Sequence, residues 1–298
     1  MRNLRTMDVP GSGPEDTLFD DQGNVYCSLR DDGCIVRVNP GSGTAQTVAS
    51  TGGAPLGLDW MPDGRLLVCN GTLGLQAVDI NTGAVESLPS DIRFGVCNNA
   101  HVLPDGTILV SDSSDQYPLA DYQKDIVENT ATGRLIKVSP DGSATVLFEQ
   151  LSFANGVACI EDGNTVLVAQ TGTMQINTVS IDGTQTGVFA IAPGHPDNLS
   201  IGTDGNVWVA VPSLPSKPLA LLHKSPVILR KVSSRLPAVL QPRPELCCRV
   251  VVYDPSGNLI QTYDGDTSLF NFVTGVREQH GVVAIGSIEQ RCIGMFER

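Results

Sequence analysis

The sequence predicts an all-β fold, and within that class a six-bladed β-propeller. Gly (31) and Pro (19) are frequent among the 298 residues, which indicates many turns. Long apolar stretches with helical spacing are scarce outside residues 213–247, so a helical fold is disfavoured. A phrase that recurs six times is the third observation, and it indicates that the chain is built from one repeated unit.

Each copy of the unit is a turn that ends in glycine, then a short apolar strand, a second turn and a further strand. The copies are "DDQGNVYCSL", "MPDGRLLVCN", "LPDGTILVSD", "IEDGNTVLVA", "GTDGNVWVA" and "EQHGVVAIGS". Their closing glycines are Gly23, Gly64, Gly106, Gly163, Gly205 and Gly281, at spacings of 41, 42, 57, 42 and 76 residues. Glycine accepts the positive φ of such hairpin turns without steric cost. A unit of about 42 residues that holds several strands is typical of a propeller blade.

The two long spacings predict two inserted segments, near 114–132 and 213–247, over one face of the propeller. We expect residues 1–298 to form a single domain. Residues 1–10 are expected to add a strand to the last blade, because pairing both ends of the chain removes an open sheet edge.

Charge and composition restrict the class of partner. The net charge of −13 disfavours nucleic acid as a partner. No run of about 18 apolar residues occurs, so no transmembrane helix is expected, and the first residues, "MRNLRTMDVPGSG", do not resemble a signal peptide. The eight cysteines are scattered without a CxxC motif. We therefore predict no zinc site, reduced thiols and a cytoplasmic location.

Polar residues recur at one register of the repeat. The residues eight positions before the six glycines are Glu15, Leu56, Asn98, Asn155, Asp197 and Val273. The innermost strands of a propeller line its central axis, so equivalent positions meet at one height. Two carboxylates and two carboxamides in a narrow channel favour a divalent cation, and oxygen ligands without Cys or His indicate Ca²⁺. A plain polar channel, in which these side chains cap strands or bind structural water, is the alternative.

The repeated phrases together resemble a superfamily of calcium-dependent six-bladed propellers. It contains the senescence marker protein/gluconolactonase family, the paraoxonases and the strictosidine synthase-like proteins, and the last branch is the most similar. The resemblance covers residues 13–296 and is carried by "GPEDTLFDDQGNVYCSLRDDGCIVRV", "GTILVSDSSD", "LFEQLSFANGVACIEDGNTVLVAQT", "GHPDNLSIGTDGNVWVAV" and "GVREQHGVVAIGSI". It implies metal ligation by Glu15, Asn98, Asn155 and Asp197, and paraoxonase-like members add the residue that matches Asn198.

The resemblance also implies a reaction. A metal-dependent hydrolase of lactones or esters is expected, in which the cation polarises the carbonyl and Asp197 is the general base. Ca²⁺ is the expected ion, although Mg²⁺, Mn²⁺ or Zn²⁺ stay open. The plant condensing enzymes of the superfamily use a catalytic Glu in the last blade, and Thr274 stands at the matching position here. This departure argues against amine–aldehyde condensation.

Several alternatives stay open. The chain is either the hydrolase, a non-catalytic binding propeller that the metal stabilises, or a condensing enzyme of the strictosidine synthase type. His195, two residues before Asp197, is a candidate for proton transfer, or else holds the loop backbone. His101 points either into the channel or between sheets. Tyr117 and Tyr122 are candidate pocket walls. The basic segment 213–247 is a lid, a membrane-facing surface or a subunit contact, and a homo-oligomer is possible.

Overall fold

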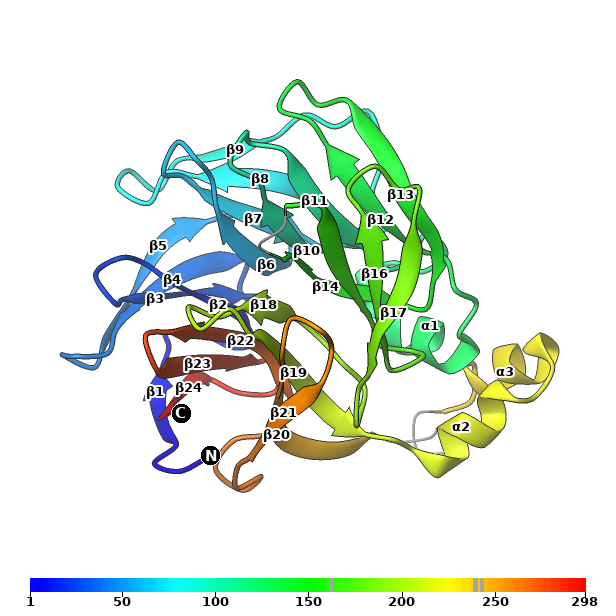
Figure 1. The fold of residues 1–298 in the computed structure, drawn as a ribbon. Coiled ribbons are helices and arrows are strands. Elements are labelled where there is room, and N and C mark those ends of the chain that lie inside the picture. The colour runs from blue at the N-terminus through cyan, green and yellow to red at the C-terminus, as the bar shows by residue number, and fades with distance from the viewer. Residues whose placement is uncertain (161–162, 238–240, 242–243) are drawn as a thin grey trace.

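The computed structural model contains six four-stranded antiparallel sheets arranged around one axis, so the predicted propeller is confirmed (Figure 1). It describes residues 1–160, 163–237, 241 and 244–298. Blade 1 is β2 (Pro14–Phe19), β3 (Val25–Leu29), β4 (Cys34–Asn39) and β5 (Thr44–Ser50). Blade 2 is β6 (Pro55–Trp60), β7 (Leu66–Asn70), β8 (Gly74–Val78) and β9 (Val85–Ser87). Blade 3 is β10 (Cys97–Val102), β11 (Ile108–Asp112), β12 (Gly133–Val138) and β13 (Ala144–Leu151).

The second half of the ring repeats this order. Blade 4 is β14 (Ala154–Cys159), β15 (Thr165–Gln170), β16 (Gln175–Ser180) and β17 (Thr186–Ile191). Blade 5 is β18 (Leu199–Ile201), β19 (Val207–Leu214), β20 (Glu245–Tyr253) and β21 (Leu259–Asp264). Blade 6 is β22 (Val273–Gln279), β23 (Val282–Ser287), β24 (Cys292–Glu297) and β1 (Arg5–Asp8). The pairing of β1 with β24, from Arg5 opposite Met295 to Asp8 opposite Cys292, closes the ring as the sequence predicts.

The repeated turns have the expected local chemistry. In blade 1 the Asp20 carboxylate accepts hydrogen bonds from the backbone N–H groups of Gln22 and Asn24, and Gly23 has a φ of 79°. The short strands between such turns are apolar on both faces because each sheet is covered by a sheet on either side. The turn residues therefore set the position at which each apolar strand begins.

The hydrophobic core lies between blades rather than within one layer. Buried apolar side chains of the described residues form six clusters, each shared by two adjacent blades. Leu18 and Tyr26 of blade 1, for example, pack with Leu58 and Val68 of blade 2. Since the clusters include one between blades 6 and 1, apolar packing also closes the ring.

Both inserted segments follow the second strand of their blade, at the same end of the propeller. The first contains a 3-10 turn, η1 (Leu119–Asp121), and α1 (Tyr122–Glu128), and the second contains α2 (Lys217–His223) and α3 (Val227–Ser233). These helices pack against one another beside the propeller (Figure 1). Among the described residues, no helix combines the length and apolar character needed to cross a membrane.

Close contact between innermost strands makes three glycines indispensable. A Cβ atom at Gly156 would lie 2.3 Å from the backbone nitrogen of Leu199 in the next blade. Gly57 and Gly275 face the backbones of their next blades in the same way, with contacts of 2.7 Å. A Cβ at these positions would force neighbouring blades apart.

We therefore predict that Gly156→Ala lowers the free energy of unfolding by about 3 kcal/mol, because rigid backbone has to move to admit the methyl group. Gly41→Ala is the matched control: its Cβ would meet only the tip of the Asn39 side chain, at 3.3 Å, and should cost less than about 1 kcal/mol. Urea unfolding in chelator measures both variants. Equal stability of the two variants would contradict the tight interblade contact.

Candidate functional site

The residues singled out by the glycine register sit at bulges of the innermost strands. In blade 1, Pro14 pairs with Leu29 and Thr17 with Cys27, so Glu15 and Asp16 fall in an irregularity between these pairs. The same shift occurs between Cys97 and Ala100 in blade 3 and between Ala154 and Val157 in blade 4. A bulge re-aims side chains that a regular strand would place alternately on its two faces. Here it turns Glu15, Asn98 and Asn155 toward the axis.

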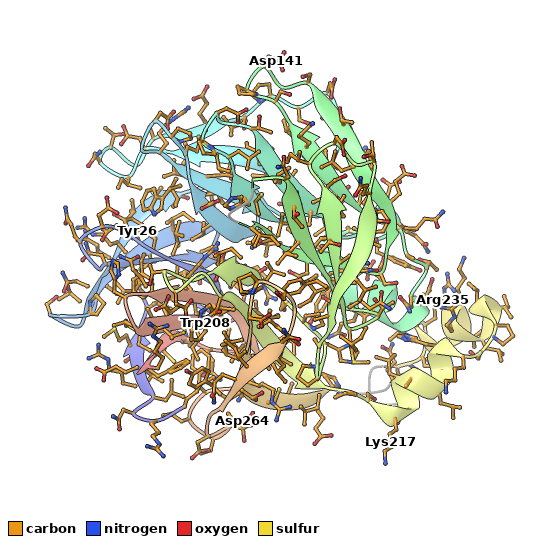
Figure 2. The ribbon with its side chains drawn as sticks, in the orientation of Figure 1. Tyr26, Asp141, Trp208, Lys217, Arg235 and Asp264 are labelled. Carbon is orange, nitrogen blue, oxygen red and sulfur yellow. The ribbon has the colours of Figure 1, made fainter. Side chains whose placement is uncertain are left out.

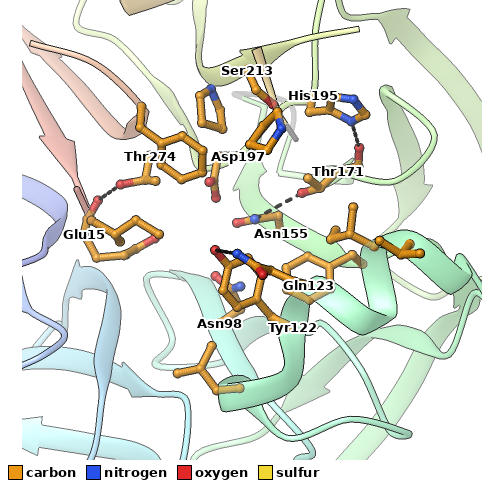
Figure 3. Close-up of a pocket in the computed structure, with 18 of the residues that line it drawn as sticks. Glu15, Asn98, Tyr122, Gln123, Asn155, Thr171, His195, Asp197, Ser213 and Thr274 are labelled. Carbon is orange, nitrogen blue, oxygen red and sulfur yellow. Dashed lines mark hydrogen bonds between the residues drawn. The ribbon is translucent and has the colours of Figure 1, made fainter. Parts of the chain in front are cut away.

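Four of the predicted side chains converge on one pocket. Glu15, Asn98, Asn155 and Asp197 all line a cavity of about 400 Å³ at the propeller axis, and their polar ends face a common centre (Figure 3). Asn198 is buried beside them and donates from Nδ2 to Oε1 of Glu15 at 3.0 Å. The structure therefore brings together all five residues that the sequence predicts as metal ligands. Leu56 lines the cavity as the apolar member of the ring.

The sixth position of the ring is Thr274 and not Val273. Val273 is fully buried in the core and pairs with Ser287, as Ala154 pairs with Gln170 in blade 4. Thr274 lines the pocket. Blade 6 joins its first two strands by a two-residue turn between Gln279 and Val282, whereas blade 1 has five residues between Phe19 and Val25. Counting eight residues back from Gly281 therefore overshoots by one.

Hydroxyl groups fix the orientation of two of the amides. Ser113 Oγ donates to the Ala154 carbonyl at 2.7 Å, so it can only accept from Asn98 Nδ2, at 2.8 Å. Thr171 Oγ1 likewise donates to the Pro196 carbonyl at 2.8 Å and accepts from Asn155 Nδ2 at 3.2 Å. Because the NH₂ groups are held by these acceptors, the amide oxygens face the axis.

These oxygens have no protein partner. Glu15 Oε2 and the Oδ1 atoms of Asn98, Asn155 and Asn198 are buried without a hydrogen-bond donor within the described part of the chain. Leaving a buried polar atom unsatisfied costs about 1–3 kcal/mol, so four at one point are unusual. Carboxylate and amide oxygens suit a hard divalent cation such as Ca²⁺. No three Cys, His, Asp or Glu side chains of the described residues form a metal-binding group, so an ion here has to use the amides.

The two carboxyls are electrostatically strained without a cation. Burial raises the pKa of Glu15 well above its usual range, and the negative charges of Asp16 and Asp197 raise it further. Burial also raises the pKa of Asp197 to about 7, against the effect of the Asn155 amide. A divalent ion between them would stabilise both ionised forms.

His195 holds the loop backbone, which is one of the two roles that the sequence leaves open, and it stays a candidate for proton transfer. It lines the pocket, and its Nδ1 lies 2.8 Å from the Thr171 carbonyl. A carbonyl only accepts, so Nδ1 carries the hydrogen, and Nε2 of the neutral ring has a free lone pair. His101 is different: it contacts Asp59 at 3.3 Å and is not among the pocket residues.

The inserted segments form much of the pocket wall. Leu119, Tyr122, Ile126 and Val127 come from the first segment, and Leu219 comes from α2. The prediction that Tyr117 is a wall residue is wrong, because its hydroxyl donates to Glu128 Oε1 at 2.7 Å on the far side of α1. Phe153 and Phe272, both with positive φ, add aromatic surface.

Sequence reasoning missed a second ring of residues, which includes Ser113 and Thr171. Five of these residues directly follow the second strand of their blade, and the sixth, Pro212, lies near the end of β19. The ring consists of Arg30, Gly71, Ser113, Thr171, Pro212 and Ile288. Five of the six lie seven residues after the repeat glycine, and Thr171 lies eight after it, so the same glycines could have located them. Arg30 is the only Lys or Arg among the described residues that line the pocket.

Solved structures with similar folds include two propellers. A gluconolactonase from Xanthomonas campestris superposes with a TM-score of 0.71 at 18% identity, covering 99% of this chain and 89% of its own. A calcium-binding protein, regucalcin, from Agrobacterium tumefaciens gives 0.69 at 16% identity, covering 98% and 93%. At these identities the likeness concerns the fold.

Sequence comparison places the chain more narrowly. A model described as strictosidine synthase matches residues 98–184, and one described as strictosidine synthase-like, N-terminal, matches residues 1–38. Strictosidine synthase-like protein 6 of Arabidopsis thaliana is 29% identical over 89% of this chain and 74% of its own length. Adipocyte plasma membrane-associated protein of Salmo salar is 31% identical over 79% of this chain, which spans only 61% of that relative. In sequence the chain is therefore similar to the strictosidine synthase-like proteins, and in fold it is similar to gluconolactonase and regucalcin propellers.

Proposed function

We propose that this protein is a Ca²⁺-dependent hydrolase of lactones or esters. The observation that carries the proposal is the set of four buried, unpartnered oxygens, three of which belong to residues that line an accessible pocket. Glu15, Asn98, Asn155, Asp197 and Asn198 would hold the ion. When bound, Ca²⁺ would act as a Lewis acid on the substrate carbonyl and stabilise the negative charge that develops there.

The protein groups supply proton transfer. Asp197 is the one member of the ligand set that is only partly buried, so its carboxylate is open to the pocket and can accept a proton from the attacking water. His195 Nε2 is an acceptor on the same wall and can pass that proton on. The apolar residues of the inserted segments shield the reacting carbonyl from bulk water.

A hydrolase needs more features at this site than a propeller that the ion only stabilises. A non-catalytic propeller needs the ligands but not an open carboxylate, a histidine with a free nitrogen and a cavity of about 400 Å³ leading to them. The condensation reaction of the strictosidine synthase type would need an acid–base residue at position 274. The residue here is Thr274, and its hydroxyl donates to the Glu15 carbonyl at 2.8 Å. Glu278, the glutamate of β22, is bonded to Thr203 and Gly281 and is not among the pocket residues.

We propose a cytoplasmic location as well. None of the eight cysteines forms a disulfide bond, and seven of them are buried. Such thiols stay reduced in the cytoplasm, where disulfides are rare.

Calcium binding tests the ligand set. Glu15→Gln keeps the shape of the side chain but removes a charge, so we expect calorimetry to show at least about tenfold weaker Ca²⁺ binding. Glu278→Gln is the control, because it makes the same change to a buried glutamate outside the pocket. If wild-type protein takes up no divalent cation, or both variants weaken binding equally, the ligand set is wrong.

The metal-free protein should lose stability as the pH rises. Protonation of Asp197 is favoured in the folded state, because its pKa there is about 7, above the usual value near 3.9. The resulting stabilisation is complete below about pH 4 and is lost as the pH rises through about 7. In chelator, the melting temperature should fall by about 3 °C or more between pH 5.5 and 8. Asp197→Asn, which cannot titrate, should reduce this slope, and Glu15, whose pKa is also raised, should supply the remainder. An unchanged slope would contradict the assignment.

Hydrolysis tests the reaction itself. On a panel of lactones and aryl esters, Asp197→Asn should lower kcat by about 10²-fold or more while calorimetry still detects Ca²⁺, since an amide oxygen can replace the ligating carboxylate oxygen. Asp254→Asn changes a turn residue that is not among the pocket residues and should leave kcat unchanged. His195→Gln should lower kcat by at least about tenfold with Ca²⁺ affinity retained. Hydrolysis that survives complete removal of the ion would refute the mechanism.

A further inference from the structure

The second inserted segment carries an unusual concentration of exposed apolar side chains. Among the described residues, thirteen large apolar side chains are exposed, and seven of them lie between 221 and 246. They are Leu221, Val227, Ile228, Leu229, Val232, Leu236 and Leu246. Scattered exposed leucines are ordinary, but a cluster on one segment marks a surface that contacts something apolar.

The attachment of α3 to α1 turns this apolar surface outward. Arg230 Nη1 donates to the carbonyls of Glu128 and Asn129, at 2.6 and 3.0 Å. Ser234 Oγ donates to Glu128 Oε1 at 2.5 Å. Because a helix turns once every 3.6 residues, the opposite side of α3 presents Ile228 and Val232, which are 67% and 55% exposed. The hydrogen bonds of Arg230 and Ser234 to α1 therefore fix the orientation of α3, with Ile228 and Val232 facing outward.

Basic residues border the apolar surface. Lys217, Lys224, Lys231 and Arg235 lie on or beside α2 and α3, and none forms a side-chain ion pair within the described residues. Residues 213–244 contain no Asp or Glu, although the whole chain has a net charge of −13. Figure 2 shows Lys217 on α2 and Arg235 beside α3, where the helices project from the propeller. This charge is opposite to that of the rest of the molecule.

We propose that α2 and α3 form a docking surface for the anionic face of a phospholipid bilayer. Leu221, Ile228 and Val232 would enter the boundary between headgroups and acyl chains, while the lysines contact lipid phosphates. A lysine stem packs along apolar surface with its ammonium in the polar layer, which suits this mixed border. A symmetric contact with a second copy would instead bring two basic surfaces together.

The docking surface lies on the side of α2 that faces away from the pocket. Leu219 of α2 lines the pocket, whereas Leu221, two residues further on, is 72% exposed. A bilayer bound at α2 and α3 would therefore lie beside one pocket wall. The surface does not depend on the proposed hydrolysis, since Ile228 and Val232 are not among the pocket residues.

Vesicle binding tests the proposal. Calcium-loaded protein, freed of excess ion by gel filtration, is sedimented with vesicles of phosphatidylcholine alone or with about 30% phosphatidylserine. We expect binding to the anionic vesicles, little binding to the neutral ones, and loss of binding in about 0.5 M salt. The double variant Ile228→Glu/Val232→Glu should bind the anionic vesicles at least about tenfold more weakly. Lys224→Glu/Lys231→Glu should reduce binding by a similar factor.

The control variant changes an equally exposed apolar pair elsewhere. Leu259→Glu/Ile260→Glu alters side chains of β21 that are 51% and 50% exposed, and it should bind like the wild type. Melting temperatures establish that each variant is folded. The proposal fails if the wild-type protein does not bind anionic vesicles, or if the control variant loses as much binding as the Ile228→Glu/Val232→Glu variant. Ultracentrifugation provides a second test. The proposal also fails if the protein binds no vesicles and forms a dimer that the Ile228 and Val232 changes dissociate, because a second copy would then cover the surface.

Discussion

The fold depends on one constraint, the meeting of polar oxygens at the propeller axis. Six innermost strands place equivalent residues at one height, and in this chain five oxygen-bearing side chains gather there. Two of the amides cannot rotate their oxygens away, because Ser113 and Thr171 hold their NH₂ groups. Each unsatisfied oxygen costs about 1–3 kcal/mol, and adjacent carboxylates repel. A cation at the centre would remove both costs, and the proposed Ca²⁺ site rests on this argument.

The residue after each ring position shows how the ring is held in place. Side chains and glycines alternate around it, in the order Asp16, Gly57, Asn99, Gly156, Asn198 and Gly275. Asp16 accepts from the Leu58 N–H at 3.0 Å, and Asn99 accepts from the Val157 N–H at 3.0 Å, each in the next blade. Asn198 departs from this pattern and donates to Glu15. The alternating pattern is therefore broken at Asn198, the position proposed as an additional ligand.

Much of this could be predicted from the sequence, because turn chemistry is local. The repeat glycines adopt positive φ, as Gly23 and Gly64 do, and they locate the strands and four ring residues. The same glycines could also have located Ser113 and Thr171. In blade 6 the count from the glycine points to Val273, one residue before Thr274. The cause is the two-residue turn of this blade, which the sequence does not reveal as a gap. The helices of the inserted segments have no repeat to align with, so the identity of wall residues such as Val127 and Leu219 could be learned only from their packing.

The separation between scaffold and inserted segments has a functional consequence. The groups that would bind the ion and move protons belong to the repeated strands and their loops, where blade packing holds them rigidly. Tyr122, Ile126 and Leu219, which shape the space above them, belong to segments inserted after the second strand of a blade. Changes in these segments alter the shape of the pocket without disturbing the ring, because the segments are connected to the propeller through loops and are not part of the packing between blades. The chemistry of the site and its choice of substrate can therefore vary independently in this chain, and substrate preference should follow the apolar helices rather than the ion.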